Sequence, residues 1–106
     1  MSYITMVAYP AVADAKFNLQ YYTNNHMQLV TKYWTEYGLL HWRVITFDAG
    51  PDGSKPYSVA STMTWKSIEG FQKAMASKSA AELVADLENF SDQPPIFLIG
   101  HVAASG

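Results

Sequence analysis

Three histidines are the side chains best suited to proton transfer near neutral pH, and His26 is the strongest candidate among them. An imidazole titrates close to neutrality and can act as a general acid or base when it reaches a cavity. Tyr22 stands four residues earlier, so in a helix the two side chains share one face, where the tyrosine can orient the ring or contact a ligand. The same spacing also fits a histidine and a tyrosine packed in an ordinary apolar core. We interpret His26 and Tyr22 as the catalytic candidates.

A second group of polar candidates lies on a predicted strand. His41 and Arg43 are two residues apart and share a strand face, and Arg43 is the only guanidinium available to bind a carboxylate or phosphate with two hydrogen bonds. A solvated edge strand that discourages aggregation is the alternative explanation of this pair. The histidines lack H-x-H or H-x-x-x-H spacing and the chain has no cysteine, so we expect no metal site. No phosphate loop or dinucleotide fingerprint is present, and we expect no cofactor.

The predicted strand at residues 56–65 has one face of small side chains, including Ala60 and Thr62, which leaves room for a ligand. Together with Tyr9 and Trp42, this face can line an apolar pocket for a flat aromatic or other hydrophobic small molecule. Alternatively, these threonines simply pack as β-formers against the helices. The ligand-binding candidates are Tyr9, Trp42, Arg43 and Thr62.

Composition narrows the kind of protein. The chain has 106 residues, 49% hydrophobic and 15% charged, which predicts one globular domain over residues 1–106. A formal net charge of −2 provides no positive field for phosphates, so no nucleic acid partner is expected. Without cysteines, without a signal-like N-terminus and without an apolar run near the roughly 20 residues that span a bilayer, the chain is expected to be soluble and cytoplasmic, with no membrane partner.

Two helical regions are predicted to separate four strands. Residues 15–37 contain neither glycine nor proline, which predicts a helix capped by Asp14 and ended by Gly38. Ser67 is expected to cap the second helical region, which a capping box beginning at Ser79 is expected to divide. Short β-branched and aromatic runs predict strands at residues 2–9, 40–48, 56–65 and 96–102.

This order of elements, βαββαβ, predicts an α+β fold of the ferredoxin-like type. Right-handed crossovers place both helical regions on one face of a four-stranded antiparallel sheet. The other face is apolar as well, since Ile4 and Met6 alternate with Tyr3 and Val7 along the first strand. Four or five such side chains left in water would each forgo about 1.5–3 kcal/mol, comparable in sum with a domain's net stability of about 5–15 kcal/mol. We therefore predict a homodimer that forms a dimeric α+β barrel; a sheet with one wet face is the alternative.

Two segments of the chain resemble a known protein family. The segments are Phe17-x-x-x-Tyr21-Tyr22-x-x-x-His26-x-x-Leu29-Val30, and Phe90-Ser91-Asp92-x-x-Pro95 followed by Ile99-Gly100-x-Val102. They are similar to the helix signature and the closing segment of the EthD family, named for ethyl tert-butyl ether degradation. With the order of elements, the resemblance extends over nearly the whole chain. It implies the dimeric α+β barrel shared with small monooxygenases, muconolactone isomerases and polyketide-tailoring enzymes, and its histidine matches His26.

The resemblance implies a small protein that acts on or binds a hydrophobic molecule, whether aromatic, polyketide-like or related to ether degradation. As an enzyme, it would be a cofactor-independent monooxygenase, isomerase or dehydratase. His26 would then move a proton on an enolisable or phenolic substrate, and Tyr22 would orient the ring. The alternative is a non-catalytic accessory protein that binds such a molecule and delivers it to a separate oxygenase.

Overall fold

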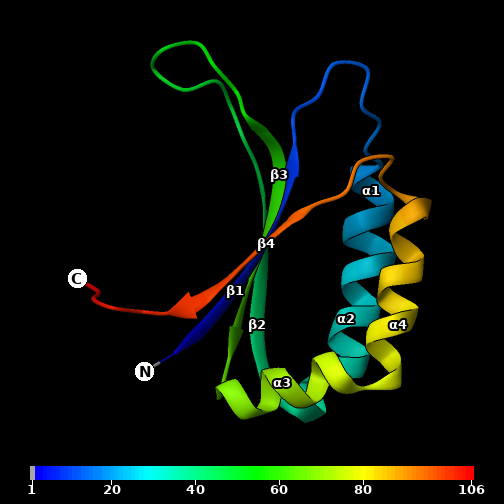
Figure 1. Ribbon diagram of the computed structural model, residues 1–106, viewed down its shortest axis with the longest axis vertical. Coiled ribbons are helices and arrows are strands. Elements are labelled where there is room, and N and C mark those ends of the chain that lie inside the picture. The colour runs from blue at the N-terminus through cyan, green and yellow to red at the C-terminus, as the bar shows by residue number, and fades with distance from the viewer. Residues whose placement is uncertain (1) are drawn as a thin grey trace.

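Four antiparallel strands form a single sheet in the order β2-β3-β1-β4. The computed structural model describes residues 2–106, and Figure 1 shows the arrangement of their elements. The strands are β1 (Tyr3–Pro10), β2 (Leu39–Thr46), β3 (Tyr57–Trp65) and β4 (Ile96–His101). Their order and the two crossovers confirm the predicted ferredoxin-like α+β fold, with small differences at the strand ends.

Each crossover consists of several short helical segments. The first comprises α1 (Leu19–Tyr21), the π-helical turn η1 (Tyr22–His26), α2 (Met27–Trp34) and the 3₁₀ turn η2 (Thr35–Tyr37). The second comprises α3 (Ile68–Ala76), α4 (Lys78–Ala85) and the 3₁₀ turn η3 (Asp86–Asn89). In Figure 1, α2 and α4 run side by side on one side of the sheet.

The core lies between these helices and the two central strands. Alternate residues of β1 and β3 point toward the helices, and Tyr3, Tyr9, Met63 and Trp65 are all buried there. The indole Nε1 of Trp65 donates a hydrogen bond of 3.0 Å to the hydroxyl of Thr5, so this buried polar pair is satisfied.

The opposite face of the sheet carries no helix and has many apolar side chains, as the alternation predicts. We call it the helix-free face; it includes Ile4, Met6, Ile45, Ile96 and Leu98. Leu98 pairs with Met6 across the strands, and 53% of its surface is exposed, as is 39% of that of Ile96. The folded chain therefore leaves large apolar side chains in contact with solvent.

The first helix begins later than predicted. Asp14 is not the N-cap, because it has a left-handed backbone with φ of 63° and lies in the loop after β1. Instead, Asn18 caps α1 by accepting a hydrogen bond of 3.0 Å from the backbone N–H of Tyr21. Pairing of Phe17 with Ser91 holds the preceding segment extended, a long-range contact that local cap signals do not reveal. The predicted C-terminal Gly38 is confirmed, with φ of 97°.

The second helical region is divided where the sequence predicts, with a different cap. Ser67 caps α3 as expected, since its hydroxyl accepts a hydrogen bond from the N–H of Gly70. The capping box at Ser79 is wrong, because α4 begins at Lys78 and Ser77 occupies the N-cap position. The Ser77 hydroxyl contacts the carbonyl of Ala74 and the hydroxyl of Ser79, so both serines serve the bend between the helices.

Candidate functional site

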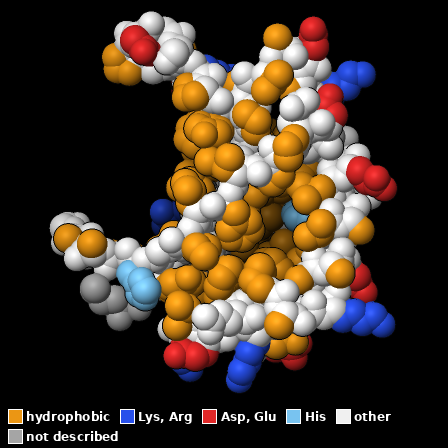
Figure 2. Space-filling view, in the orientation of Figure 1, with side chains coloured by type: hydrophobic (Ala, Val, Ile, Leu, Met, Phe, Trp, Pro, Cys, Tyr) orange, Lys and Arg blue, Asp and Glu red, His pale blue; other side chains and the backbone are white. Residues whose placement is uncertain are grey.

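An apolar cavity of about 250 Å³ lies between the sheet and the helices. Figure 2 shows this hollow lined by hydrophobic side chains, with a histidine at its edge. Its walls come from η1 and α2 of the first crossover, from α3, α4 and η3 of the second, and from β1, β3 and β4. The lining residues are Val7, Tyr9, Tyr22, His26, Met27, Val30, Trp34, Ser61, Met63, Met75, Ala80, Leu83, Val84, Leu87, Pro95 and Phe97. A small, mainly apolar ligand would be withdrawn from water in this space.

His26 joins this cavity to a carboxylate. Its side chain is 10% exposed, and its Nδ1 lies 2.9 Å from Oδ2 of Asp86. A carboxylate only accepts hydrogen bonds, so in the neutral ring the proton resides on Nδ1 and is donated to Asp86. Nε2 then carries the lone pair, and it forms no hydrogen bond with another of residues 2–106. An imidazole whose tautomer is fixed in this way can accept a proton at Nε2.

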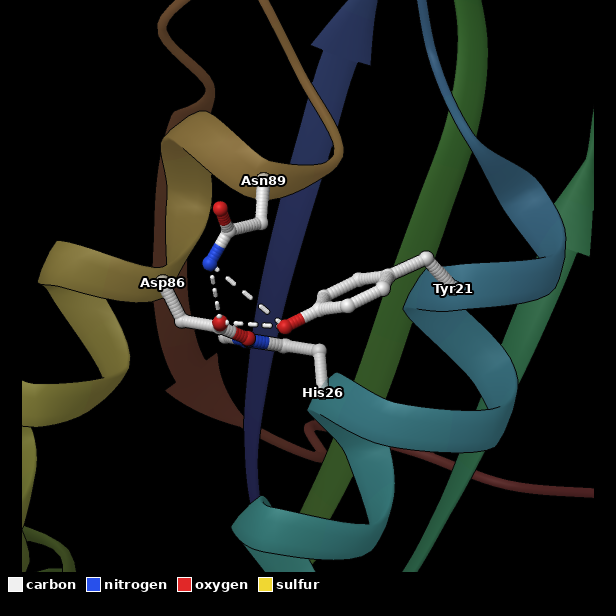
Figure 3. A network of polar contacts seen from close by, with 4 residues as sticks. All are labelled: Tyr21, His26, Asp86 and Asn89. Carbon is white, nitrogen blue, oxygen red and sulfur yellow. Dashed lines mark hydrogen bonds and ion pairs between the residues drawn. The ribbon is translucent and has the colours of Figure 1, made fainter.

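Two further side chains hold the carboxylate in place. The Tyr21 hydroxyl donates a hydrogen bond of 2.7 Å to Oδ1 of Asp86, and Nδ2 of Asn89 donates one of 2.9 Å to the same oxygen. Figure 3 shows Asp86 on η3 of the second crossover, with Tyr21 and His26 facing it from the first crossover and Asn89 on the same turn. One carboxylate oxygen thus faces the histidine while the other faces two donors.

The π-helical turn η1 explains how Tyr21 and His26 reach the same carboxylate. In a regular α-helix, residues five apart differ in direction by about 140°, so they cannot share a partner. The wider turn from Tyr22 to His26 closes with a bond from the Met27 N–H to the Tyr22 carbonyl, which brings residues five apart closer in direction. Single π-turns of this kind frequently occur at functional sites.

The protonation states follow from burial and these contacts. Burial lowers the pKa of His26 below its ordinary value of 6.5, and its contact with Asp86 only partly offsets the change. For Asp86, burial raises the pKa, but hydrogen bonds from Tyr21, Asn89 and His26 outweigh it and bring the pKa below its usual value. At neutral pH the pair is therefore a neutral imidazole beside an ionised carboxylate.

Tyr22 contacts His26 through its ring. The two rings stack at 5.5 Å with an interplanar angle of 12°, and Phe90 lies 4.7 Å from the imidazole on another side. The Tyr9 ring in turn contacts that of Tyr22 at 5.7 Å. Burial raises the pKa of both tyrosines, so their hydroxyls stay protonated. Tyr22 thus packs against the imidazole plane, while the imidazole of His26 takes Asp86 as its hydrogen-bonding partner.

Of the four ligand-binding candidates, Tyr9 is the one that lines the cavity. The Trp42 indole instead donates a hydrogen bond of 2.8 Å to the hydroxyl of Thr31, at the outer side of α2. Arg43 and Thr62 are directly paired across β2 and β3 on the helix-free face, so the sheet separates them from His26.

Sequence reasoning missed three members of the polar network: Tyr21, Asp86 and Asn89. Tyr21 is part of the helix signature, but regular helical geometry directs it away from His26. Asp86 is 60 residues from His26 and has no recognisable motif around it. Only the packing of η3 against η1 brings it to the histidine.

The fold and the cavity define a small ferredoxin-like α+β protein with an internal apolar site. Residues 10–94 match the family model described as the EthD domain. Because the match covers well over half of the chain, the chain belongs to the EthD family, and the resemblance in the two sequence segments is confirmed. No curated protein matches the chain.

Solved structures agree with this assignment. An EthD-like protein from Ralstonia eutropha JMP134 is 25% identical, with a TM-score of 0.88 over 99% of this chain and 95% of that one. A dimeric ferredoxin-like protein of unknown function from Jannaschia sp. CCS1 is 11% identical, with a TM-score of 0.65 over 95% and 98% of the two chains. SnoaB, a cofactor-independent oxygenase from Streptomyces nogalater, is 9% identical, with a TM-score of 0.56 over 98% and 93%. At these low identities, the Jannaschia protein and SnoaB show only that they share the fold of this chain.

Among residues 2–106, no helix has the length and apolar character that crossing a membrane would require.

Proposed function

We propose that this protein binds a hydrophobic small molecule with an enolisable or phenolic group and that His26 removes a proton from it. One observation carries the proposal: the neutral imidazole of His26 lines an apolar cavity while Asp86 holds its Nδ1 at 2.9 Å, which leaves Nε2 without a partner among residues 2–106. A base in this state accepts a proton without first losing one. The imidazolium that forms is stabilised by the adjacent carboxylate.

The cavity defines the class of ligand. Its volume of about 250 Å³ is smaller than the roughly 300–1,000 Å³ of sites for drug-sized molecules, which favours compounds of one or two rings. Its aliphatic and thioether walls favour an apolar body, and the stacked rings of Tyr22 and His26 favour a planar one.

Proton removal leaves the electron pair on the substrate as an enolate or phenolate. That species is an intermediate shared by isomerisation, dehydration and oxidation by molecular oxygen, so one base can serve each reaction in this fold. The fold that the chain shares with the cofactor-independent oxygenase SnoaB supports chemistry that relies on side chains alone.

The direct test follows deuterium exchange at the benzylic α-carbon of 2-tetralone, an enolisable two-ring ketone, by proton NMR in deuterated buffer. Nε2 takes the α-proton, the electron pair moves into the enolate, and a deuteron returns to carbon. We expect the wild-type protein to accelerate the exchange and to saturate with ketone. Saturable binding without faster exchange would instead indicate a binding protein, and an unchanged buffer rate without binding would contradict the proposal altogether.

We also propose that a second copy of the chain covers the helix-free face. Its exposed side chains include Ile96 and Leu98, and burial of each would contribute about 1.5–3 kcal/mol. A twofold-related copy presents the same apolar face and is therefore complementary to it. The dimeric protein from Jannaschia sp. CCS1 shares this fold, which supports the choice of partner.

Leu98→Asp should dissociate this dimer, because the new charge would be buried without a counter-ion. Light scattering coupled to size-exclusion chromatography at micromolar concentration is expected to give twice the chain mass for the wild type and the single mass for the variant. Val12→Asp places the same charge at an exposed apolar residue of the loop after β1 and should remain dimeric. A monomeric wild-type protein would contradict the proposal.

A further inference from the structure

One polar atom in the core has no partner. The indole Nε1 of Trp34 is buried and forms no hydrogen bond with another of residues 2–106. The Trp34 side chain is 6% exposed, and it lines the same cavity as His26. A buried donor without an acceptor is costly, and native proteins rarely leave one unless a ligand or a water completes it.

The other two tryptophans show that this chain ordinarily satisfies its indoles. Trp65 donates to Thr5 at 3.0 Å, and Trp42 donates to Thr31 at 2.8 Å. Trp34 packs against Trp65 with ring centroids 5.5 Å apart, while its N–H lacks an acceptor among residues 2–106.

Position along the helix separates this donor from the base. His26 and Trp34 are eight residues apart on the same cavity wall, about two turns or 12 Å along the axis. The remaining polar groups of the cavity gather around Tyr22, whose ring stacks on His26 and whose hydroxyl is close to those of Tyr9 and Ser61. Between the two ends the wall is apolar, with Met27 and Val30 on the same helix.

We propose that Trp34 is a specificity-determining residue whose indole N–H, buried in the wall of the unliganded cavity, donates a hydrogen bond to an oxygen at the far end of the ligand after a small shift of the ring opens it to the cavity. This inference rests on the proposed function and deepens it: the ligand is an elongated, planar, mostly apolar molecule. It carries its transferable proton at the His26 end and an oxygen acceptor at the Trp34 end.

The test compares 2,6-dihydroxynaphthalene, which has an oxygen at each end, with 2-naphthol, which has one. Isothermal titration calorimetry should find the wild-type protein binding the diol about threefold to tenfold more tightly, the usual effect of one neutral hydrogen bond. Trp34→Phe keeps an aromatic ring but removes the donor, so the preference should disappear. The matched variant Trp42→Phe removes an indole that already has an acceptor, and it should keep the preference.

A second measurement does not depend on whether Trp34→Phe folds. In the wild-type protein, the indole N–H resonance of Trp34, assigned by triple-resonance NMR, should move downfield with the diol and much less with 2-naphthol. Any of three results would overturn the inference. The preference for the diol persists in Trp34→Phe, the Trp34 indole resonance does not move when the diol is added, or neither probe shows saturable binding.

These outcomes are separable from those of the proposed proton transfer. If 2-tetralone exchange fails while Trp34→Phe abolishes the diol preference, the specificity role stands and the role of His26 as a base is wrong. If exchange depends on His26 while the preference persists in Trp34→Phe, the reverse holds.

Discussion

Replacing His26 with asparagine is expected to slow the protein-catalysed exchange of 2-tetralone by about 10²–10⁴-fold, the usual contribution of a positioned general base. Asparagine retains a polar group of similar reach beside Asp86 but has no lone pair of comparable basicity at the position of Nε2. The fall should appear in the rate at saturating ketone, because the apolar walls that bind the ketone are unchanged.

The control for this variant is His101→Asn. His101 lies at the end of β4, where its ring contacts that of Tyr3 at 5.0 Å, and it does not line the cavity. Its replacement should leave the exchange rate close to that of the wild type. Equal rates in His26→Asn and wild type, with both proteins folded by circular dichroism, would exclude His26 as the base.

The pH dependence of the wild-type exchange rate should also show that His26 acts as the base. Because burial lowers the pKa of His26 from 6.5, the ring is neutral above pH 6.5. The exchange rate should therefore lose its histidine contribution only as the pH falls through the lowered pKa.

The free energy of unfolding should also decrease as the pH falls. Between pH 6.5 and the lowered pKa, the unfolded chain binds a proton that the folded chain does not, so stability present above 6.5 is lost as pH falls. His26→Asn should remove this loss.

The sequence predicts the fold well because periodicity and length decide it. Alternation in β1 and β4, glycine at position 38 and serine at position 67 are local signals, and each agrees with the observed architecture. The sequence places the helix start too early because pairing between Phe17 and Ser91 holds the chain extended, and no local pattern encodes that contact.

The candidate site could be only half predicted. His26 and Tyr22 are four residues apart, so helical geometry alone brings them together. Asp86 completes the site from a different crossover, and Tyr21 reaches it only because η1 is a π-turn. The sequence also does not show which face of the sheet each residue of a strand occupies. Thr62 and Ser61 are adjacent in sequence, yet the register of β3 places Ser61 at the cavity and Thr62 on the helix-free face.

Replacing Asp86 with asparagine should lower the 2-tetralone exchange rate nearly as much as replacing His26, because the surrounding donors determine how the new amide is oriented. The hydroxyl of Tyr21 and the amide N–H of Asn89 both point at the Oδ1 position, at 2.7 and 2.9 Å. Only an oxygen can accept both bonds, so the amide oxygen takes this position and the NH₂ group faces Nδ1 of His26.

An NH₂ group at that position donates to Nδ1 and therefore places the histidine proton on Nε2. Nε2 then has no lone pair, and the base is lost although every side chain keeps its place. The same substitution in the triad of serine proteases lowers turnover about 10⁴-fold through the wrong tautomer. For Asp86→Asn we expect a fall of about 10²–10⁴-fold in the 2-tetralone exchange rate, with little change in ketone affinity.

Tyr21→Phe is the matched variant for this mechanism. It removes one donor to Asp86 but leaves the carboxylate, its bond to His26 and the bond from Asn89, so the exchange rate should fall only a few-fold. Nitrogen NMR of the His26 ring tests the tautomer directly: the protonated nitrogen should be Nδ1 in the wild type and in Tyr21→Phe, and Nε2 in Asp86→Asn. A wild-type tautomer in Asp86→Asn accompanied by a large loss of exchange would contradict this explanation, because the carboxylate would then act through its charge.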